Sequence, residues 1–342
     1  MAICLGKYLV VDRIEFTVTY LCNSSCSHCQ LGEEEKGKRF PSHVDKDKAV
    51  EIVRKVGQAY APKSIMTFGG EPLLYPEIVC AIHEQAKKVG IPIRDVITNG
   101  FWSTKAEKIQ EIAQNLAKSG VNAVSISVDC FHQEFIPLKT VKKAANSLIA
   151  AGIERVRWNP CWVVSKDHDN KYNRITKTIL QKLRNLRVEE SGGNSVQPKG
   201  RACSSLAEFF PPRTPVPKGK CGEMPYTEAL DSVKAILIEP DGRVAVCENF
   251  YIGNAFKSDI IDILENYDPF KIPEAKSILE KGMDGLTKWA KKRDVELRPE
   301  GYYNICHMCT DLRERYLQRK YGTKKVNSQK PSQTTGKRSD FG

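Results

Sequence analysis

The sequence lacks long hydrophobic runs and a basic, apolar start. No stretch of about 18 apolar residues occurs among its 342 residues, which argues against a transmembrane helix. The first residues, Met1-Ala2-Ile3-Cys4, do not resemble a secretory signal, so we predict a cytoplasmic protein without a membrane partner. Acidic residues are also in deficit, because 41 Asp and Glu stand against 53 Lys and Arg, a net charge of +12.

Half of this positive excess lies at the C-terminus. From Arg319 onward the sequence has seven Lys or Arg and one Asp, which contributes +6 of the +12. Few apolar residues accompany them, and such a segment cannot bury enough surface to offset the entropy of ordering. We predict a solvated basic tail over residues 319–342, disordered from about Val326. The remainder has no basic cluster, so no nucleic-acid partner is expected.

Strand-like and helix-like segments alternate through the first 200 residues. The predicted strands are Ile14–Thr19, Ser64–Phe68, Arg94–Thr98, Ala123–Val128, Arg155–Asn159 and, weakly, Asn194–Pro198. The predicted helices are Lys46–Ala59, Pro76–Val89, Lys105–Ser119, Leu138–Ala151 and Tyr172–Leu186. This alternation predicts an α/β fold, a partial (β/α)6 TIM-like barrel over residues 1–202. The first predicted strand starts near residue 14, so we expect no N-terminal leader-binding domain.

The residue composition and the pattern of predicted elements change after Gly200. A proline-rich stretch covers residues 211–217, and Pro240-Asp241-Gly242 then separates two strand-like runs, Ala235–Glu239 and Arg243–Cys247. This pattern indicates a hairpin. Short helices are predicted at Asp259–Tyr267 and Ala275–Lys281. We therefore predict a small α+β module over residues 203–318.

Cysteine is abundant, with 12 residues, and a reducing compartment disfavours disulfides, so the cysteines point to metal or redox chemistry. Cys22, Cys26 and Cys29 follow the first predicted strand with the spacing C-x3-C-x2-C. Three thiolates on one loop can hold three irons of a [4Fe–4S] cubane and leave the fourth open to a ligand. A zinc loop is the alternative, with His28 or a distant group as fourth ligand.

This loop resembles that of the radical S-adenosylmethionine (SAM) superfamily, and the resemblance extends over about residues 12–310. It implies that the open iron binds SAM and that one electron, from a flavodoxin- or ferredoxin-type donor, cleaves SAM to a 5′-deoxyadenosyl radical. That radical abstracts hydrogen from a substrate. His28 stands where the family commonly has an aromatic residue near the adenine.

Further polar residues follow the predicted strands. Gly69-Gly70-Glu71-Pro72 resembles the family's GGEP loop, which contacts the methionine amino group; Glu71 can accept hydrogen bonds from an ammonium group, whereas an ordinary turn is the alternative. The resemblance and the strand-end positions also make Asn99, Ser127, Asp129 and Asn159 candidates for binding SAM, with a satisfied polar core as the alternative. Arg201 lies in a Gly-Arg-Ala stretch similar to the one that closes the barrel in many relatives, and it could pair with a carboxylate.

A second group of cysteines follows the barrel. Cys221, Cys247 and the C-x2-C pair Cys306 and Cys309 can ligate one complete cluster. This resembles an auxiliary-cluster module, either a twitch or a shortened SPASM domain, so we expect one auxiliary [4Fe–4S] cluster. Zinc at the same sulfurs remains open, and Cys203 could replace one ligand.

The resemblance implies a peptide or protein maturase or oxidoreductase, or else a small-molecule dehydrogenase or cofactor-biosynthesis enzyme. A non-catalytic metal-binding protein is a remote alternative. Cys130, which follows Asp129, could return a hydrogen atom to a substrate radical, although a merely packed thiol is the plainer interpretation. His132 could contact substrate.

Overall fold

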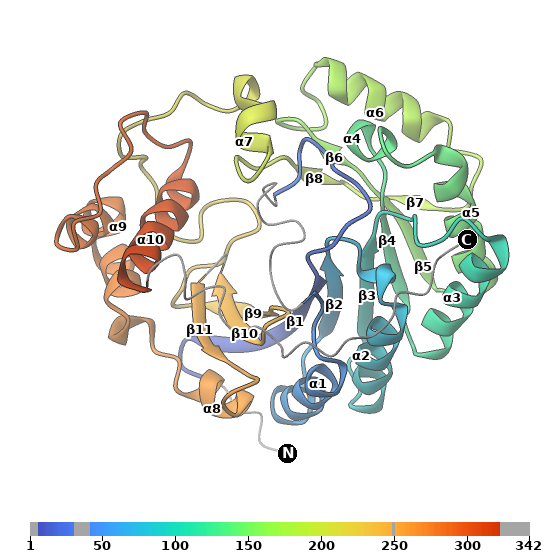
Figure 1. Ribbon diagram of the computed structural model, residues 1–342, viewed down its shortest axis with the longest axis horizontal. Helices are drawn as coiled ribbons and strands as arrows, with labels where there is room; N and C mark the ends of the chain where they lie inside the picture. The colour runs from blue at the N-terminus through green and yellow to red at the C-terminus, as the bar shows by residue number, and fades with distance from the viewer. Residues whose placement is uncertain (1–5, 31–41, 248–249, 322–342) are drawn as a thin grey trace, which may run out of the picture.

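A computed structural model describes residues 6–30, 42–247 and 250–321. Its centre is a nine-stranded sheet in the order β11-β10-β9-β1-β2-β3-β4-β5-β7. Strands β1 to β5, β7 and β9 are parallel to one another, and β10 is antiparallel to both β9 and β11. The sheet curves, with α1, α2, α3 and α5 along its outer side, while α7, α9 and α10 lie across from them (Figure 1). The α/β fold with a partial barrel is confirmed.

The strands of the large sheet are β1 Leu9–Thr19, β2 Ser64–Gly69, β3 Ile93–Thr98, β4 Ala123–Ser127, β5 Arg155–Asn159, β7 Glu189–Glu190, β9 Val233–Ile238, β10 Arg243–Cys247 and β11 Phe250–Asn254. A separate pair consists of β6 Cys161–Trp162 and β8 Asn194–Ser195. The helices are α1 Lys46–Tyr60, α2 Pro76–Lys88, α3 Ala106–Lys118, α4 Cys130–Gln133, α5 Leu138–Ala150, α6 Lys171–Gln181, α7 Ala202–Ser205, α8 Ile260–Glu265, α9 Pro273–Lys291 and α10 Ile305–Tyr321. Among the described residues, none of these helices is long and apolar enough to cross a membrane.

Amphipathic periodicity explains the outer helices. In α3 the apolar residues Ile109, Ile112 and Leu116 recur at helical spacing, and all three are buried. At the start of α1, the Asp45 carboxylate accepts a hydrogen bond from the Lys48 backbone N–H, as an N-cap residue does. These helices cover the outer face of the sheet and enclose its core.

The two faces of the sheet differ in exposure. Along β2, Ile65 and Thr67 point toward the helices and are fully buried, whereas Met66 and Phe68 point the other way and are half-buried. The same alternation puts Arg157 and Asn159 of β5 half-buried on the inner face. The inner face is therefore the accessible one, and it holds polar side chains.

Three sequence predictions are corrected. The sixth strand of the barrel is β7, which pairs with β5, whereas the predicted segment Asn194–Pro198 contributes only β8 to the small sheet. The segment that carries Cys306 and Cys309 is a helix, α10, which was not predicted. This helix extends to Tyr321, so the first residues of the predicted basic tail, 319–321, are helical. The segment predicted to be disordered, from about Val326, falls within residues 322–342, which lie outside the described residues.

The predicted hairpin forms, and its strands belong to the barrel sheet. Strand β9 pairs in parallel with β1, for example Ile14 with Ile236, and β10 then runs back along β9. Because β10 is antiparallel to β9, Cys247 at its end lies away from the carboxyl edge of the sheet, where β1 leads to Cys22. The same sheet thus leads into the first cysteine loop through β1 and holds Cys247 of the second group on β10. The division into domains at residues 202 and 203 stays a prediction.

Candidate active site and second cysteine site

The C-x3-C-x2-C loop begins directly after β1, at the carboxyl edge of the sheet. Cys22 and Cys29 are half-buried and Cys26 is buried. The Cys29 N–H donates to the Cys26 carbonyl at 3.1 Å, which closes the loop into a turn. Neighbouring loops from β2, β3 and β4 contact this turn, and the soft sulfur donors suit an iron–sulfur cluster.

Gly69 and Gly70 permit a close backbone approach to the strand that leads into the cysteine loop. The Gly70 N–H donates to the Thr19 carbonyl at 2.7 Å, and the Glu71 N–H donates to the Leu21 carbonyl at 2.8 Å. A Cβ atom on Gly70 would lie 2.0 Å from the Leu21 carbonyl oxygen. Any side chain there would therefore displace the residue that precedes Cys22.

Glu71 is fully buried and its carboxylate binds protein groups. It accepts hydrogen bonds from the Leu73 N–H at 3.0 Å, the Thr98 hydroxyl at 2.7 Å and the Asn99 N–H at 2.7 Å. Burial raises the pKa of Glu71 to about 7, although these hydrogen bonds oppose the shift. The structure thus gives Glu71 a role in joining the loops after β2 and β3; its contact with SAM stays a prediction. Pro72 follows it as the first residue of a short 3-10 turn.

Asn99 is placed against the cysteine loop, as its strand-end position predicted. Its Nδ2 atom donates to the Asn23 side-chain oxygen at 2.7 Å and lies 3.8 Å from the Cys22 Sγ atom. The Asn23 side chain in turn donates to the Phe101 carbonyl at 2.6 Å. These bonds connect the end of β3 with the first cysteine.

Asp129 organises the other side of the loop. This fully buried carboxylate caps α4 and lies 2.9 Å from the His132 Nδ1 atom. Burial opposes ionisation, but the charge and hydrogen bonds of His132 outweigh it and lower the pKa of Asp129 to about 2. His132 therefore presents its other ring nitrogen toward the loop.

His28 packs on α4. Its ring stacks on Phe131 with the centroids 4.7 Å apart, and it meets the His132 ring edge-on at 4.9 Å. The ligand atoms of Cys26, His28 and His132 lie within 4.8 Å of one another. That arrangement can also hold a single zinc ion, so metal identity is the property that separates the two interpretations.

Two further thiols lie beside this loop. Cys130 is buried, and burial raises its pKa to about 12, so the thiol is protonated at neutral pH. Its role as hydrogen donor stays a prediction. Cys161 is not among the site residues predicted from the sequence, but its N–H donates to Asp129 at 3.1 Å and its thiol packs in the same cluster as Cys26. A cysteine two residues past the fifth predicted strand was the available signal.

Ser127 and Asn159 lie side by side at the ends of β4 and β5, and both are half-buried. Two residues before Asn159 on the same face of β5, Arg157 donates to the Asp95 carboxylate at 2.7 Å and to the Ser125 hydroxyl at 2.9 Å. Sequence reasoning missed this polar group, although period-2 alternation along three neighbouring strands contains it. The inner face therefore offers hydrogen-bonding groups to the cofactor and to a polar substrate.

Residues 199–205 connect the cysteine loop to the second group of cysteines. The Arg201 N–H donates to the Cys29 carbonyl at 3.0 Å, and the Ser205 hydroxyl donates to the Ser27 carbonyl at 2.6 Å. Arg201 thus contacts the loop through its backbone, whereas its predicted pairing with a carboxylate stays a prediction. Burial lowers the pKa of Lys199, and the thiols of Cys306 and Cys247 oppose the shift.

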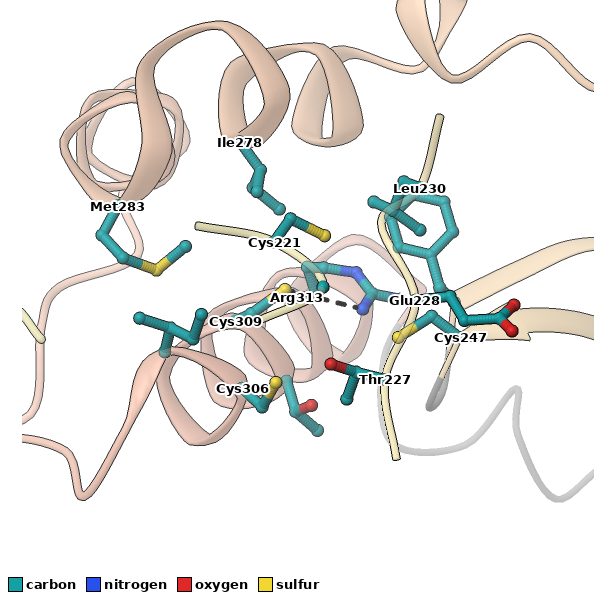
Figure 2. A pocket seen from close by; sticks show the side chains of 14 residues that line it. Cys221, Thr227, Glu228, Leu230, Cys247, Ile278, Met283, Cys306, Cys309 and Arg313 are labelled. Atoms are coloured by element: carbon teal, nitrogen blue, oxygen red, sulfur yellow. Dashed lines mark hydrogen bonds between the residues drawn. The ribbon is translucent and has the colours of Figure 1, made fainter. Parts of the chain in front are cut away.

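The four predicted auxiliary cysteines line one pocket. Cys221, Cys247, Cys306 and Cys309 converge there from three segments of the chain, with Arg313 between them (Figure 2). Burial raises the pKa of Cys221 and Cys247 to about 11 and that of Cys306 to about 12. Four sulfur donors in one pocket fit a four-thiolate metal centre of iron–sulfur or zinc type.

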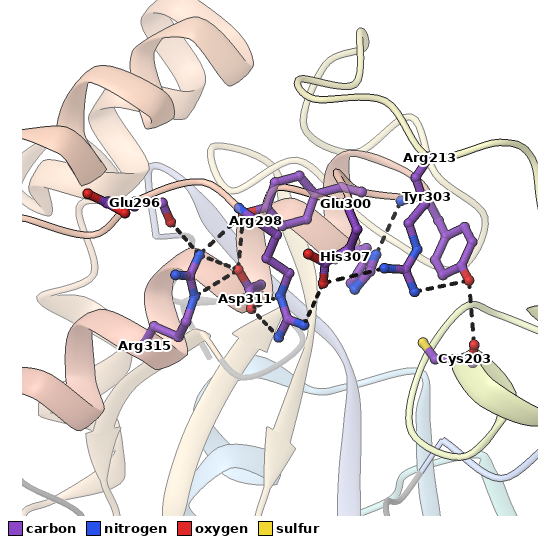
Figure 3. A network of polar contacts seen from close by, with 10 residues as sticks. Cys203, Arg213, Glu296, Arg298, Glu300, Tyr303, His307, Asp311 and Arg315 are labelled. Carbon is purple, nitrogen blue, oxygen red and sulfur yellow. Dashed lines mark hydrogen bonds and ion pairs between the residues drawn. The ribbon is translucent and has the colours of Figure 1, made fainter.

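Cys203 is not among the residues that line this pocket. It lies at the end of a polar network in which the Tyr303 hydroxyl donates to the Cys203 carbonyl at 3.5 Å and Arg213 lies over the Tyr303 ring (Figure 3). At the other end of the network Asp311 of α10 accepts from Arg298 and Arg315, each at 2.7 Å. These contacts hold α10, and with it Cys306 and Cys309, in place.

Comparison with known proteins gives the same assignment for the first site. A model described as "Radical SAM superfamily" matches residues 16–167, which include the cysteine loop, the GGEP loop and Asp129. A "Probable GTP 3′,8-cyclase" of Sulfurisphaera tokodaii is 24% identical over 75% of this chain and 74% of its own length. A "Putative peptide biosynthesis protein YydG" of Bacillus subtilis is 27% identical over 35% of this chain and 37% of its own length.

Among solved structures, "Native anSMEcpe with bound AdoMet" aligns with 90% of this chain and 97% of its own, with 14% identity and a TM-score of 0.49. The match to the Radical SAM superfamily therefore covers residues 16–167 of this chain, the part that holds the cysteine loop.

Proposed function

We propose that this radical SAM enzyme uses two [4Fe–4S] clusters to oxidise or mature a peptide or protein. Cys22, Cys26 and Cys29 would hold the SAM-binding cluster, and Cys221, Cys247, Cys306 and Cys309 the auxiliary cluster. The observation that carries the proposal is the convergence of those last four cysteines, which are 88 residues apart in sequence, on one pocket (309 − 221 = 88). A second redox centre is what distinguishes such an enzyme from one that needs SAM cleavage alone.

When bound, the first cluster supplies one electron for SAM cleavage and so a carbon radical that abstracts hydrogen from substrate. The chain's own residues orient these groups. Asn99 and the Glu71 loop hold Cys22, while Asp129 fixes His132, whose ring lies close to Cys26. Ser127 and Asn159 offer hydrogen bonds at the carboxyl edge of the sheet, where they would bind SAM.

Two observations bear on the substrate. The similarity to a peptide biosynthesis protein favours a peptide, and the half-buried inner face provides polar groups for a backbone. A small molecule is the second candidate, because the cyclase from S. tokodaii aligns with 75% of this chain, far beyond the cysteine loop. In both cases a flavodoxin- or ferredoxin-type protein would deliver the electron.

Anaerobic reconstitution tests the metal assignment. We expect about eight irons per chain for two cubane clusters. We also expect 5′-deoxyadenosine to form from SAM only when dithionite is present. Zinc at either site, or iron without SAM cleavage, would contradict the proposal.

The substrate is then tested by adding short peptides encoded beside the gene, or GTP, to the reconstituted enzyme. The true substrate should raise 5′-deoxyadenosine formation above the substrate-free rate and change in mass. Product from GTP but from no peptide would establish the small-molecule alternative.

A further inference from the structure

Arg313 is a buried cation inside the four-cysteine pocket. Only 6% of its surface is exposed, and it lines the pocket together with all four cysteines. Among the described residues that line this pocket, Arg313 is the only positively charged one. A guanidinium group loses much of its hydration in such a place, so its contacts there matter for the energy of the site.

Helical geometry places Arg313 next to a sulfur. It follows Cys309 by four residues on α10, and residues at that spacing lie on the same face of a helix. Its Nη1 atom donates to the Cys309 Sγ atom at 3.9 Å (Figure 2). The guanidinium plane lies over the Phe250 ring at 4.1 Å from the centroid. A sulfur contact on one side and a ring on the other thus fix its position.

We propose that Arg313 is a positioning residue that tunes the auxiliary centre by raising its reduction potential. The inference rests on the proposed function, because it requires a redox-active cluster at these sulfurs. A cluster held by four thiolates is anionic, and reduction adds one more negative charge. The cation and its N–H···S hydrogen bond stabilise the reduced form more than the oxidised form, since net charge and hydrogen bonds to sulfur set such potentials.

The geometry also makes this role local. Arg313 attracts the Cys247 sulfur electrostatically and contacts Cys309, so it acts on two ligands from different segments. Cys22, Cys26 and Cys29 do not line the pocket that holds Arg313, so the SAM-binding cluster should respond much less. Its potential is therefore an internal reference within the same sample.

The test compares three variants of the full-length reconstituted enzyme by redox titration followed with electron paramagnetic resonance. Arg313→Gln removes the charge, Arg313→Lys keeps it without the planar group, and Arg319→Gln removes an exposed charge from the same helix. We expect Arg313→Gln to shift the auxiliary midpoint downward by a tenfold change in the reduced-to-oxidised ratio, about 59 mV for one electron. Arg319→Gln should match the wild type, and Arg313→Lys should fall between.

An auxiliary midpoint in Arg313→Gln equal to that of the wild type overturns the inference. If Arg313→Gln loses its auxiliary iron, the midpoint of Arg313→Lys is used instead. A midpoint of Arg313→Lys equal to that of the wild type then overturns the inference. A wild-type protein with zinc instead of iron at the four cysteines overturns the proposed function itself, which separates that failure from the failure of the Arg313 assignment.

Discussion

At the scale of single residues, the cysteine loop depends on each of its three thiolates. Cys26 is the buried member and packs among Phe131, Val163 and Ala202. Because no other cysteine of the loop can replace it, a cubane cluster would lose one iron ligand when it is substituted. The chain offers a matched control in Cys80, which is half-buried on α2 and packs against the core of the barrel.

We therefore expect Cys26→Ala to abolish 5′-deoxyadenosine formation and to lower the bound iron by about half, since one of two cubane clusters is lost. Cys80→Ala should keep both at wild-type values. The measurements are iron analysis and chromatography of the SAM products under anaerobic conditions. SAM cleavage by Cys26→Ala would refute the assignment of the loop.

Glu71 gives a prediction about pH. Its pKa rises from 4.5 to about 7 on burial, so the folded state favours the protonated form. The stability that this group contributes is complete below about pH 4.5 and is lost as the pH rises through about 7. The free energy of unfolding should therefore fall by up to about 3 kcal/mol over that interval.

Urea unfolding of the apoprotein at pH 5 and pH 8 measures this effect. Glu71→Gln should remove this component of the pH dependence, because the amide does not titrate, whereas the exposed Glu107→Gln on α3 should leave it intact. An identical pH dependence in Glu71→Gln and wild type would mean that Glu71 ionises normally in the fold.

At the scale of elements, β1 and the GGEP loop form one unit. The loop continues the pairing of β1 with β2 as far as Leu21, and Gly70 permits that approach. Gly70→Ala would force the added methyl group against the Leu21 carbonyl, so we expect the loss of most SAM-cluster iron with the auxiliary iron retained. Gly192, where an added Cβ meets nothing within 4 Å, provides the control substitution Gly192→Ala.

Mössbauer spectroscopy with separate cluster signatures would measure the two iron populations. Full SAM-cluster occupancy in Gly70→Ala would show that the cysteine loop tolerates displacement of Leu21. Gly70 would then be needed only for close approach of the backbone to SAM.

Helix α10 is held by Asp311, whose carboxylate is almost fully buried between Arg298 and Arg315. Both partners are partly exposed, so each pairing contributes modestly, and we expect Asp311→Asn to destabilise the protein by about 1–2 kcal/mol. Auxiliary iron should then be lost faster to a chelator. Asp294→Asn removes a carboxylate that is 80% exposed and should change neither property; equal chelation rates in the two variants would contradict the anchoring role.

The elements also show what the sequence could predict. The five strands up to Asn159 and the predicted helices between them follow from apolar periodicity, which is strong because one face of each of these elements is buried. The short strand β7 has no such signal, since both of its glutamates are exposed. Helix α10 was missed because cysteines and several arginines flank its short apolar stripe, Ile305, Met308 and Leu312, which is nevertheless buried. Ion pairs and pocket contacts add to this packing.

At the scale of the whole molecule, the two cysteine sites were both foreseeable as sets of residues. The spacing of Cys22, Cys26 and Cys29 is local, and the C-x2-C pair is local too. That Cys221 and Cys247 join this pair depends on the pairing of β9 with β1, which no local pattern contains. Arg313 was missed because α10, which places it beside Cys309, was not predicted. Cys161 was missed because its hydrogen-bond partner Asp129 is distant in sequence.

The proposed roles of the two sites, SAM cleavage at the first and substrate turnover at the second, lead to a prediction for the whole enzyme. Cys309→Ala removes one sulfur from the auxiliary pocket but leaves the SAM loop untouched. We expect substrate-free SAM cleavage within about twofold of wild type, together with a loss of substrate product of at least about tenfold. Both products are measured in one anaerobic assay, and normal product formation would show that the second centre is dispensable.

The parallel pairing of β9 with β1 has a mechanical consequence. Strand register changes only in steps that turn side chains to the other face, so neither strand can slide gradually along the other. The hydrogen bonds between β1 and β9 therefore keep the two strands in a fixed relative position. Cys22 lies three residues past the end of β1, and Cys247 ends β10, the strand paired with β9, so the span between these two cysteines changes only if the register changes. A substrate that contacts both centres has to match that span.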